Sequence, residues 1–277
     1  MGRSTDKQLA GDQDGCLRRF VASQYVDVHC HCLPGLDDGP STMPEAKALC
    51  KALADDGIST AIATPHQLGR FDGAYSTAEI RQAVADLNRV LSEQRIPLTV
   101  LPGADVRVDE RIPQLLESDR ILTLADTGKH ILLELPHVVF VDIEPLIKKL
   151  VALNVTPIIS HPERHNALNR RPKTILKWLA HSAHLQITAA SLLGCFGSET
   201  ETAAWHILSS GWASLVATDS HDLNNRRPLM RAAFGLISAK LDEDLAGLVC
   251  IENPSRVANG RDLVSVWLHH NRQEVDQ

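Results

Sequence analysis

The chain has 277 residues, of which 44% are hydrophobic and 22% charged, and its formal net charge at pH 7 is −6. This composition supports a sizeable buried core and excludes wholesale disorder. The acidic balance disfavours nucleic acid as a partner, because proteins that bind duplexes are generally basic. No apolar run approaches the roughly 18 residues that a membrane span needs, so we expect none.

The N-terminal segment differs from the rest of the chain. Residues 1–22 carry acidic residues early and lack the apolar region of a secretory signal. We therefore expect residues 1–22 to be a mobile N-terminal extension and residues 23–277 to form a single domain. The six cysteines include no CxxC pair, which indicates free thiols in a reducing cytoplasm.

Short β-branched runs alternate with helical patterns along the whole chain. One helix is expected within residues 42–57, and another begins at the capping-box pair Ser76 and Glu79. Residues 142–154 and 200–211 are also typical of amphipathic helices. The predicted strands are residues 25–31, 59–66, 98–108, 130–136, 156–162, 185–191 and 214–221.

Seven strand-and-helix repeats predict an α/β fold with a parallel sheet, because parallel strands are joined by crossover helices. A closed barrel is favoured over an open doubly wound sheet, since no Gly-rich phosphate loop follows the first strand. In such barrels the active site is built at the carboxyl ends of the strands.

Metal-binding residue types lie near the carboxyl ends of six of the seven predicted strands. His29 and His31 are two residues apart on a strand, so both side chains point to one face, where they can share an ion. A lone residue of this kind is usually hydrogen-bonded or at the surface, but a whole rim of them is costly unless they are paired or metal-bound. The other candidates are Asp37, Asp38, His66, Asp105, Glu134, His161, Asp219 and His221.

Two cysteines alternate with these histidines. If the histidines face the lumen, Cys30 faces the surrounding helices, and Cys32 has the same parity. The Cys-x5-Arg spacing of cysteine-dependent tyrosine phosphatases fails from both residues. A match from Cys250 to Arg256 lacks the preceding histidine. The histidines are therefore the better candidates for the chemistry.

Seven segments, DVHCHCLPGLDDG, ATPH, LPGADVRV, LLELP, SHPERH, SLLGCFG and ATDSHDLNNR, occur in this order between residues 27 and 226. Together they resemble the metal-dependent tyrosine-protein phosphatases of bacterial capsule and exopolysaccharide clusters, in the polymerase and histidinol phosphatase (PHP) superfamily. The resemblance implies a distorted (β/α)7 TIM-like barrel with three divalent ions, commonly manganese. Imidazole and carboxylate ligands also suit iron or zinc. The expected mechanism is direct attack by a metal-bound hydroxide, without a cysteine nucleophile.

The same resemblance implies a role for each candidate residue. One ion would be held by His29, His31, Glu134 and Asp219. A second would be held by Asp38, His66 and His221. The third would be held by Asp105 and His161, with Glu134 bridging. Arg164 and Arg226 match the phosphate-binding arginines of the family.

The partner that the resemblance implies is the autophosphorylated, tyrosine-rich tail of a bacterial kinase that controls polysaccharide assembly. A small-molecule phosphatase of the histidinol-phosphate type remains an alternative, although the short loops favour an open site. A non-catalytic metal-binding regulator is the second alternative. It is suggested by Asp105, where the family usually has Glu, and by Asp222, where it usually has Asn. A nuclease role is disfavoured by the acidic balance.

The histidines and cysteines of the first strand predict opposite mutant phenotypes. His31→Ala is expected to abolish metal-dependent hydrolysis of p-nitrophenyl phosphate, because it removes an implied ligand. Cys30→Ser is expected to keep most of the activity. Steady-state rates of the two manganese-loaded variants check this. An inactive Cys30→Ser beside an active His31→Ala would identify cysteine as the nucleophile.

Overall fold

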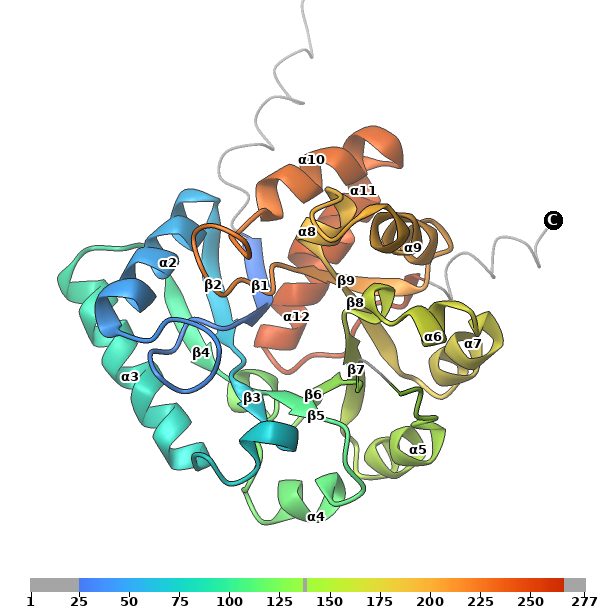
Figure 1. The fold of residues 1–277 in the computed structure, drawn as a ribbon, viewed down its shortest axis with the longest axis horizontal. Helices are drawn as coiled ribbons and strands as arrows, with labels where there is room; N and C mark the ends of the chain where they lie inside the picture. Colours follow the sequence, from blue (N-terminus) through green and yellow to red (C-terminus); the bar gives the residue numbers. More distant parts are fainter. Residues whose placement is uncertain (1–24, 137–138, 267–277) are drawn as a thin grey trace, which may run out of the picture.

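The computed structural model describes residues 25–136 and 139–266. The predicted extension at residues 1–22 lies outside the described residues, and the single domain over residues 23–277 stays a prediction. All paired strands are parallel and surround a common axis, with helices around the outside (Figure 1). The predicted α/β barrel is therefore confirmed. Its strands are β1 (Tyr25–Cys30), β2 (Ile58–Ala63), β3 (His66–Gln67), β4 (Thr99–Pro102), β5 (Asp105–Arg107), β6 (His130–Glu134), β7 (Thr156–Ser160), β8 (His184–Thr188) and β9 (Ala213–Ala217).

Two of the predicted strands are broken in the middle. The run at 59–66 forms β2 and β3 on either side of Pro65, which has no N–H to donate to a ladder. The run at 98–108 forms β4 and β5 on either side of Gly103, where a Cβ would come within 2.7 Å of Ile62. The sheets accordingly run β1-β2-β4 and β3-β5-β6-β7-β8-β9. β2 and β3 together take the place of one strand of the barrel, and β4 and β5 together take the place of the next.

The barrel closes where β1 meets the segment that follows β9. The His31 backbone N–H donates to the Ser220 carbonyl at 2.9 Å, and the Asp219 N–H donates to the His29 carbonyl at 2.8 Å. This closure brings the two histidines of the first strand beside the carboxylate of the last.

Helices cover the outer face of the barrel (Figure 1). The predicted capping box at Ser76 and Glu79 forms at the start of α3 (Thr77–Glu93). The other three predicted helices are α2 (Met43–Asp55), α5 (Glu144–Ala152) and α9 (Ser198–Ser209). The further α-helices are α4 (Ile112–Glu117), α6 (Asn166–Asn169), α7 (Pro172–Ala180), α8 (Ala189–Leu192), α10 (Met230–Lys240), α11 (Glu243–Gly247) and α12 (Asn253–Ala258), and the short 3-10 or π turns are η2 (Gly69–Phe71), η3 (Leu124–Asp126), η4 (Pro162–Arg164) and η5 (Leu248–Glu252).

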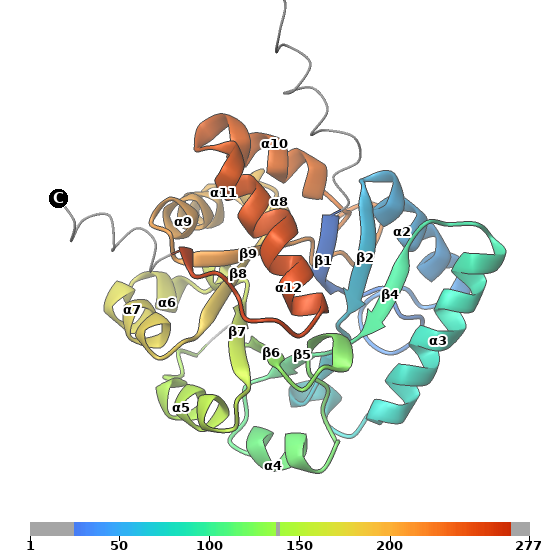
Figure 2. The ribbon, with the colours of Figure 1, turned by 180° about the vertical axis from the view of Figure 1, so that it is seen from behind.

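The inside of the barrel is apolar at one end and polar at the other. Leu132 and Ile158 pack there with Val257 of α12, the helix that crosses the back of the barrel in Figure 2. Glu134 and Ser160 lie two residues further along the same strands, so their side chains also point into the barrel. Within residues 25–136 and 139–266, no helix has the length and hydropathy that a bilayer crossing requires.

A register shift interrupts β1 just before the histidines. Asp27 pairs with Ala61 and Cys30 with Ala63, so three steps along β1 oppose two along β2. The additional residue is a β-bulge. It lets Val28 face the interior core while His29, its neighbour, turns toward the site.

Beyond the bulge the alternation resumes. Cys30 and Cys32 lie in the outer core together with Cys50 of α2. The prediction that Cys30 faces the surrounding helices is therefore confirmed.

The buried carboxylate of Asp27 stabilises the bulge. It accepts hydrogen bonds from the backbone N–H of His29 at 3.3 Å and of Thr218 at 2.9 Å, and also from the Thr218 hydroxyl. Burial raises the pKa of Asp27 to about 7, although the hydrogen bonds from Thr218 oppose the rise. One side chain therefore fixes the end of β1 to the end of β9.

Asp27→Ala is expected to lower the free energy of unfolding by about 2–4 kcal/mol, because it leaves buried donors at His29 and Thr218 without an acceptor. Urea unfolding of the metal-free protein measures this value. Asp55→Ala is the matched control, since Asp55 is an exposed partner of Lys51. Its effect is expected to stay within about 0.5 kcal/mol. Equal effects of the two substitutions would contradict the role given to Asp27.

Candidate metal centre

Nine side chains capable of binding metal gather at the carboxyl end of the barrel. They form four overlapping groups, in each of which the potential ligand atoms lie within 4.8 Å of one another. Most are buried, whereas the side chain of Asp38 is 41% exposed. The groups are His29, His31 and Asp219; His31, Asp38, His66 and His221; His29, Asp105 and His161; and His66, Asp105 and Glu134.

These groups contain all nine residues to which the resemblance assigns an ion, but not Asp37, the tenth candidate named from the sequence. His31 belongs both to the group of Asp219 and to the group of Asp38. Glu134 lies with His66 and Asp105 rather than with the two histidines of β1. Because the groups share residues, they form one continuous cluster.

The imidazoles of β1 are oriented by hydrogen bonds at their far nitrogens. His29 Nδ1 lies 2.8 Å from Gln186 Oε1, and His31 Nδ1 lies 2.6 Å from Asp37 Oδ2. The two Nε2 atoms are then 3.1 Å apart. Burial lowers the pKa of His29 to about 4 and that of His31 to about 3, so both are neutral at pH 7. Neutral imidazole is the form that binds metal ions.

Asp219 connects these histidines to two arginines. Its Oδ1 lies 3.3 Å from His29 Nε2 and 3.6 Å from His31 Nε2. Its Oδ2 accepts a hydrogen bond from Arg226 and forms an ion pair with Arg164, each at 2.6 Å. Burial alone would raise the pKa of Asp219, but Arg164, His29 and Arg226 hold it well below its ordinary value. The charged carboxylate therefore faces the histidines and the arginines at once.

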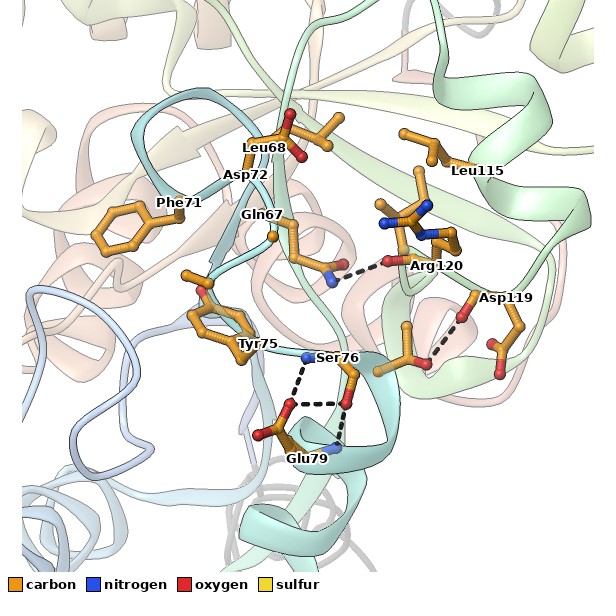
Figure 3. Close-up of a pocket in the computed structure, with 14 residues that line it drawn as sticks. Gln67, Leu68, Phe71, Asp72, Tyr75, Ser76, Glu79, Leu115, Asp119 and Arg120 are labelled. Carbon is orange, nitrogen blue, oxygen red and sulfur yellow. Dashed lines mark hydrogen bonds between the residues drawn. The ribbon is translucent and has the colours of Figure 1, made fainter.

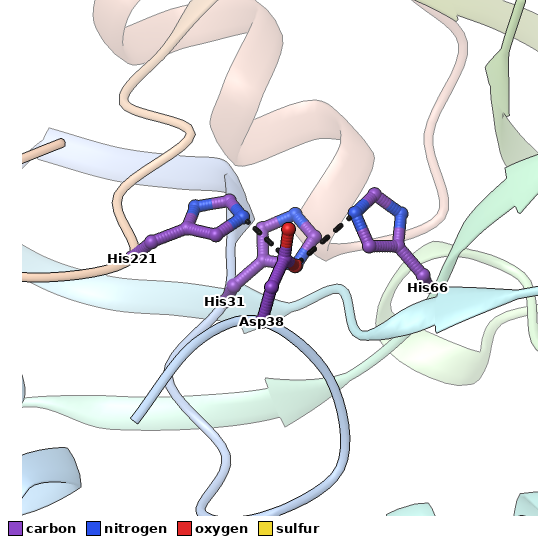
Figure 4. A group of neighbouring side chains, drawn as sticks. All are labelled: His31, Asp38, His66 and His221. Carbon is purple, nitrogen blue, oxygen red and sulfur yellow. Dashed lines mark ion pairs between the residues drawn. The ribbon is translucent and has the colours of Figure 1, made fainter. Parts of the chain in front are cut away.

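Asp38 lies between two further histidines (Figure 4). Its Oδ1 is 3.4 Å from the Nε2 atoms of both His66 and His221. The neighbouring imidazoles of His221 and His66 hold the pKa of Asp38 below its ordinary value. Burial would lower the pKa of His66, but Asp38, Asp105 and Glu134 raise it to about 9. In the metal-free protein, His66 therefore provides positive charge among the carboxylates.

Asp105 is the most deeply buried of the carboxylates. Burial and the nearby charge of Glu134 raise its pKa well above the ordinary value. Its Oδ2 lies 3.6 Å from His29 Nε2 and 3.5 Å from His66 Nδ1. Arg107, two residues along the same strand, donates to Glu134 at 2.9 Å.

Two of the candidate ligands have left-handed backbone conformations. His161 has φ 33° and Asp219 has φ 51°. Each follows the end of a strand, β7 and β9 respectively. Such conformations cost about 1–3 kcal/mol in non-glycine residues and occur preferentially at functional sites.

Divalent metal ions fit these residues. Asp105 Oδ2, Asp219 Oδ1 and His221 Nε2 are buried without a hydrogen-bond partner among the described residues, a condition that is normally unfavourable. The contacts of 3.1–3.6 Å are typical of atoms that share one ion, since ligands about 2.1 Å from a metal lie roughly 3.0–3.6 Å apart. The set contains nitrogen and oxygen donors but no thiolate, which suits manganese, iron or zinc.

A pocket of about 420 Å³ opens above this cluster. Arg164 and Arg226, the two arginines named from the sequence, line it together with several of the candidate ligands. The sequence assigned no site role to the six other lining residues: Gln67, Leu68, Arg70, Phe71, Arg107 and Phe196.

The sequence did not predict the orienting role of three residues. Asp37 was named as a candidate ligand, but not as the partner of His31 Nδ1. Gln186 lies in the sixth predicted strand, the one strand without a candidate ligand, and a buried amide in an apolar run was the available signal. Arg107 could have been found from its spacing, because it has the same facing as Asp105.

Comparison with known proteins identifies relatives over most of the chain. The family model described as "Capsular polysaccharide synthesis, CpsB/CapC" matches residues 25–259. Tyrosine-protein phosphatase YwqE of Bacillus subtilis (strain 168) is 33% identical over 224 residues, which are 79% of this chain and 86% of that protein. Tyrosine-protein phosphatase CpsB of Streptococcus pneumoniae is 27% identical over 240 residues, 84% of this chain and 97% of that protein.

A solved structure agrees with these matches. It comes from the crystal structures of YwqE from Bacillus subtilis and CpsB from Streptococcus pneumoniae, described as unique metal-dependent tyrosine phosphatases. It superposes on this chain with a TM-score of 0.81 and 30% sequence identity, covering 86% of this chain and 96% of that one.

Asp37→Ala is expected to weaken manganese binding about 10- to 100-fold, because His31 loses the carboxylate that orients its ring. Isothermal titration calorimetry with manganese chloride measures the change. Asp86→Ala on α3 is the control, since Asp86 is an exposed partner of Arg89, and it should bind manganese as the wild type does. Unchanged affinity in Asp37→Ala would remove Asp37 from the metal centre.

Proposed function

The chain belongs to the family described as "Capsular polysaccharide synthesis, CpsB/CapC", and we propose that it is a metal-dependent phosphatase that hydrolyses phosphotyrosine in proteins. The observation that carries the proposal is the double use of Asp219. One of its oxygens faces His29 and His31, and the other forms ion pairs with Arg164 and Arg226. Metal ligands and anion-binding groups thus share one pocket.

The nine clustered side chains would hold three divalent ions, with manganese as our proposal. His29, His31, Glu134 and Asp219 would hold the first ion. Asp38, His66 and His221 would hold the second. Asp105 and His161 would hold the third, and Glu134 would bridge from its place beside His66 and Asp105. When bound, such ions lower the pKa of a coordinated water to near neutrality and offset the charge of phosphoryl oxygens.

The chain's own residues would bind and orient the phosphoryl group. Arg164 and Arg226 present guanidinium groups to the pocket, and such groups make paired, charge-assisted hydrogen bonds to phosphate oxygens. Their Nε atoms are buried without a partner among the described residues. Asp219 fixes both arginines relative to the histidines of β1, and therefore relative to the point of attack.

A direct displacement without a phosphocysteine intermediate is the mechanism that we propose. None of the described residues that line the pocket is a cysteine. Cys30 and Cys32, the cysteines nearest in sequence to the histidines, are buried in the outer core. Their thiols therefore have no path to a phosphate in the pocket.

A protein substrate is supported by the open rim of the pocket. The side chains of Arg70 and Asp38 at this rim are 67% and 41% exposed. We propose the autophosphorylated tail of a bacterial tyrosine kinase as the substrate, with the control of capsule or exopolysaccharide synthesis as the role and the cytoplasm as the location. A tail of this kind can reach an exposed site without the opening of a lid.

A kinetic comparison of two phosphomonoesters tests the substrate. With the manganese-loaded enzyme, kcat/KM for a phosphotyrosyl peptide is expected to exceed that for histidinol phosphate by at least about 10-fold, because the rim is open and phenolate leaves more easily than alkoxide. Chelation with EDTA should remove both activities, and added manganese should restore them. A preference for histidinol phosphate would contradict the proposal.

A further inference from the structure

Two phenylalanine side chains flank the metal pocket. The chain has five phenylalanines, and aromatic residues make up only 4% of it. Phe71 and Phe196 nevertheless both line the pocket that contains His66 and Glu134, and both rings are partly exposed there. Exposed aromatic surface is unfavourable in water, so a pair of such rings at one opening needs an explanation.

Phe71 lies on a tightly constrained loop between β3 and α3. Leu68 has φ 65°, a left-handed conformation that is unusual for leucine. Gly69 has φ 58°, and a Cβ there would meet the side chain of Arg107 at 3.1 Å. The ring of Phe71 is stacked on that of His66, at a centroid distance of 5.5 Å and an angle of 15°.

The same loop separates the metal pocket from a second pocket of about 290 Å³. Phe71 lines both pockets, and Figure 3 shows its ring turned away from Leu115, Asp119 and Arg120 on the far wall of the second one. On its other side the ring is stacked on His66, which lines the metal pocket.

Phe196 lies in the segment between α8 and α9 and contacts a proposed phosphate-binding arginine. The guanidinium carbon of Arg164 is 4.0 Å from the centroid of its ring. Arg164 also donates to Thr188 at 2.8 Å and to Asp219 at 2.6 Å, so the arginine is fixed on several sides. One aromatic ring is therefore adjacent to a phosphate-binding group, and the other is adjacent to a metal ligand.

We propose that Phe71 and Phe196 determine the specificity for aryl phosphates by contacting the two sides of the phosphotyrosine ring. This inference rests on the proposed function. Aromatic rings attract one another in offset-stacked or edge-to-face arrangements beyond the effect of buried area. With the phosphoryl group held at the metals and arginines, the ester carbon of an aryl substrate enters the space beside these rings. A short alkyl phosphate reaches the same metals without touching them.

Inhibition by two non-hydrolysable phosphonates isolates the contribution of the rings. Phenylphosphonate and methylphosphonate present the same anionic group and differ in the ring. For the manganese-loaded wild type, the inhibition constant of phenylphosphonate should be about 5- to 50-fold lower than that of methylphosphonate. Phe71→Ala and Phe196→Ala should each reduce this ratio roughly 2- to 10-fold, and Phe71→Trp should retain it.

Phe140→Ala is the matched control. Phe140 is also partly exposed and carries an arginine over its ring, with the Arg171 guanidinium carbon 4.5 Å from the centroid, but it does not line the metal pocket. The ratio of the two inhibition constants for Phe140→Ala should equal that of the wild type. If Phe196 only supports Arg164, then Phe196→Ala will weaken both phosphonates equally, and that result overturns the proposed role of Phe196.

The outcomes separate this inference from the proposed function. Hydrolysis of a phosphotyrosyl peptide by a wild type that binds both phosphonates equally would overturn the role of the rings and leave the function standing. A preference for phenylphosphonate that depends on both rings, without peptide hydrolysis, would support an aryl-binding site and overturn the protein substrate.

Discussion

The crowding of buried carboxylates at one end of the barrel is the constraint on which the rest of the structure depends. Asp105, Glu134 and Asp219 are buried, and each lies within a few ångströms of at least one histidine of the cluster. Buried negative charges of this kind are tolerated only with positive charge beside them. His66, Arg107, Arg164 and Arg226 supply part of it, and divalent ions are the natural source of the remainder.

Several local features of the backbone and side chains position the residues of the cluster. The bulge in β1 puts Val28 and His29 on the same side of the strand, which regular alternation forbids. Left-handed backbone at His161 and Asp219 occurs just where β7 and β9 end. Hydrogen bonds from Asp37 and Gln186 set the rings of His31 and His29. The stability of the barrel supports local conformations that are unfavourable on their own.

The pocket combines two kinds of recognition on separate elements. On the proposed function, the anionic group would be bound by residues at strand ends and by arginines that share the carboxylate of Asp219 with the candidate ligands. The organic part of a substrate is met by phenylalanines in the segments outside the barrel. Chemistry and substrate choice can therefore vary independently, as is general for α/β barrels.

The sequence by itself determined the fold class, the seven strand positions and, through the resemblance to a known family, the nine residues of the cluster. It could do so because alternating β-branched runs and helical periodicity are local signals, and because ligand-type residues at strand ends meet in any closed parallel barrel. The sequence also predicted that Cys30 faces the surrounding helices, because side chains alternate along a strand and its neighbours His29 and His31 face the site.

Only the tertiary structure decided which candidate ligands lie next to one another and which other residues orient them. Glu134 lies with His66 and Asp105, which depends on the register between β5 and β6 and not on spacing along the chain. The partners Gln186 and Asp37, the sharing of Asp219 by two arginines, and the approach of Phe71 and Phe196 all join segments far apart in sequence. Contacts across a barrel are set by strand register, loop conformation and closure, and no local pattern encodes these distances.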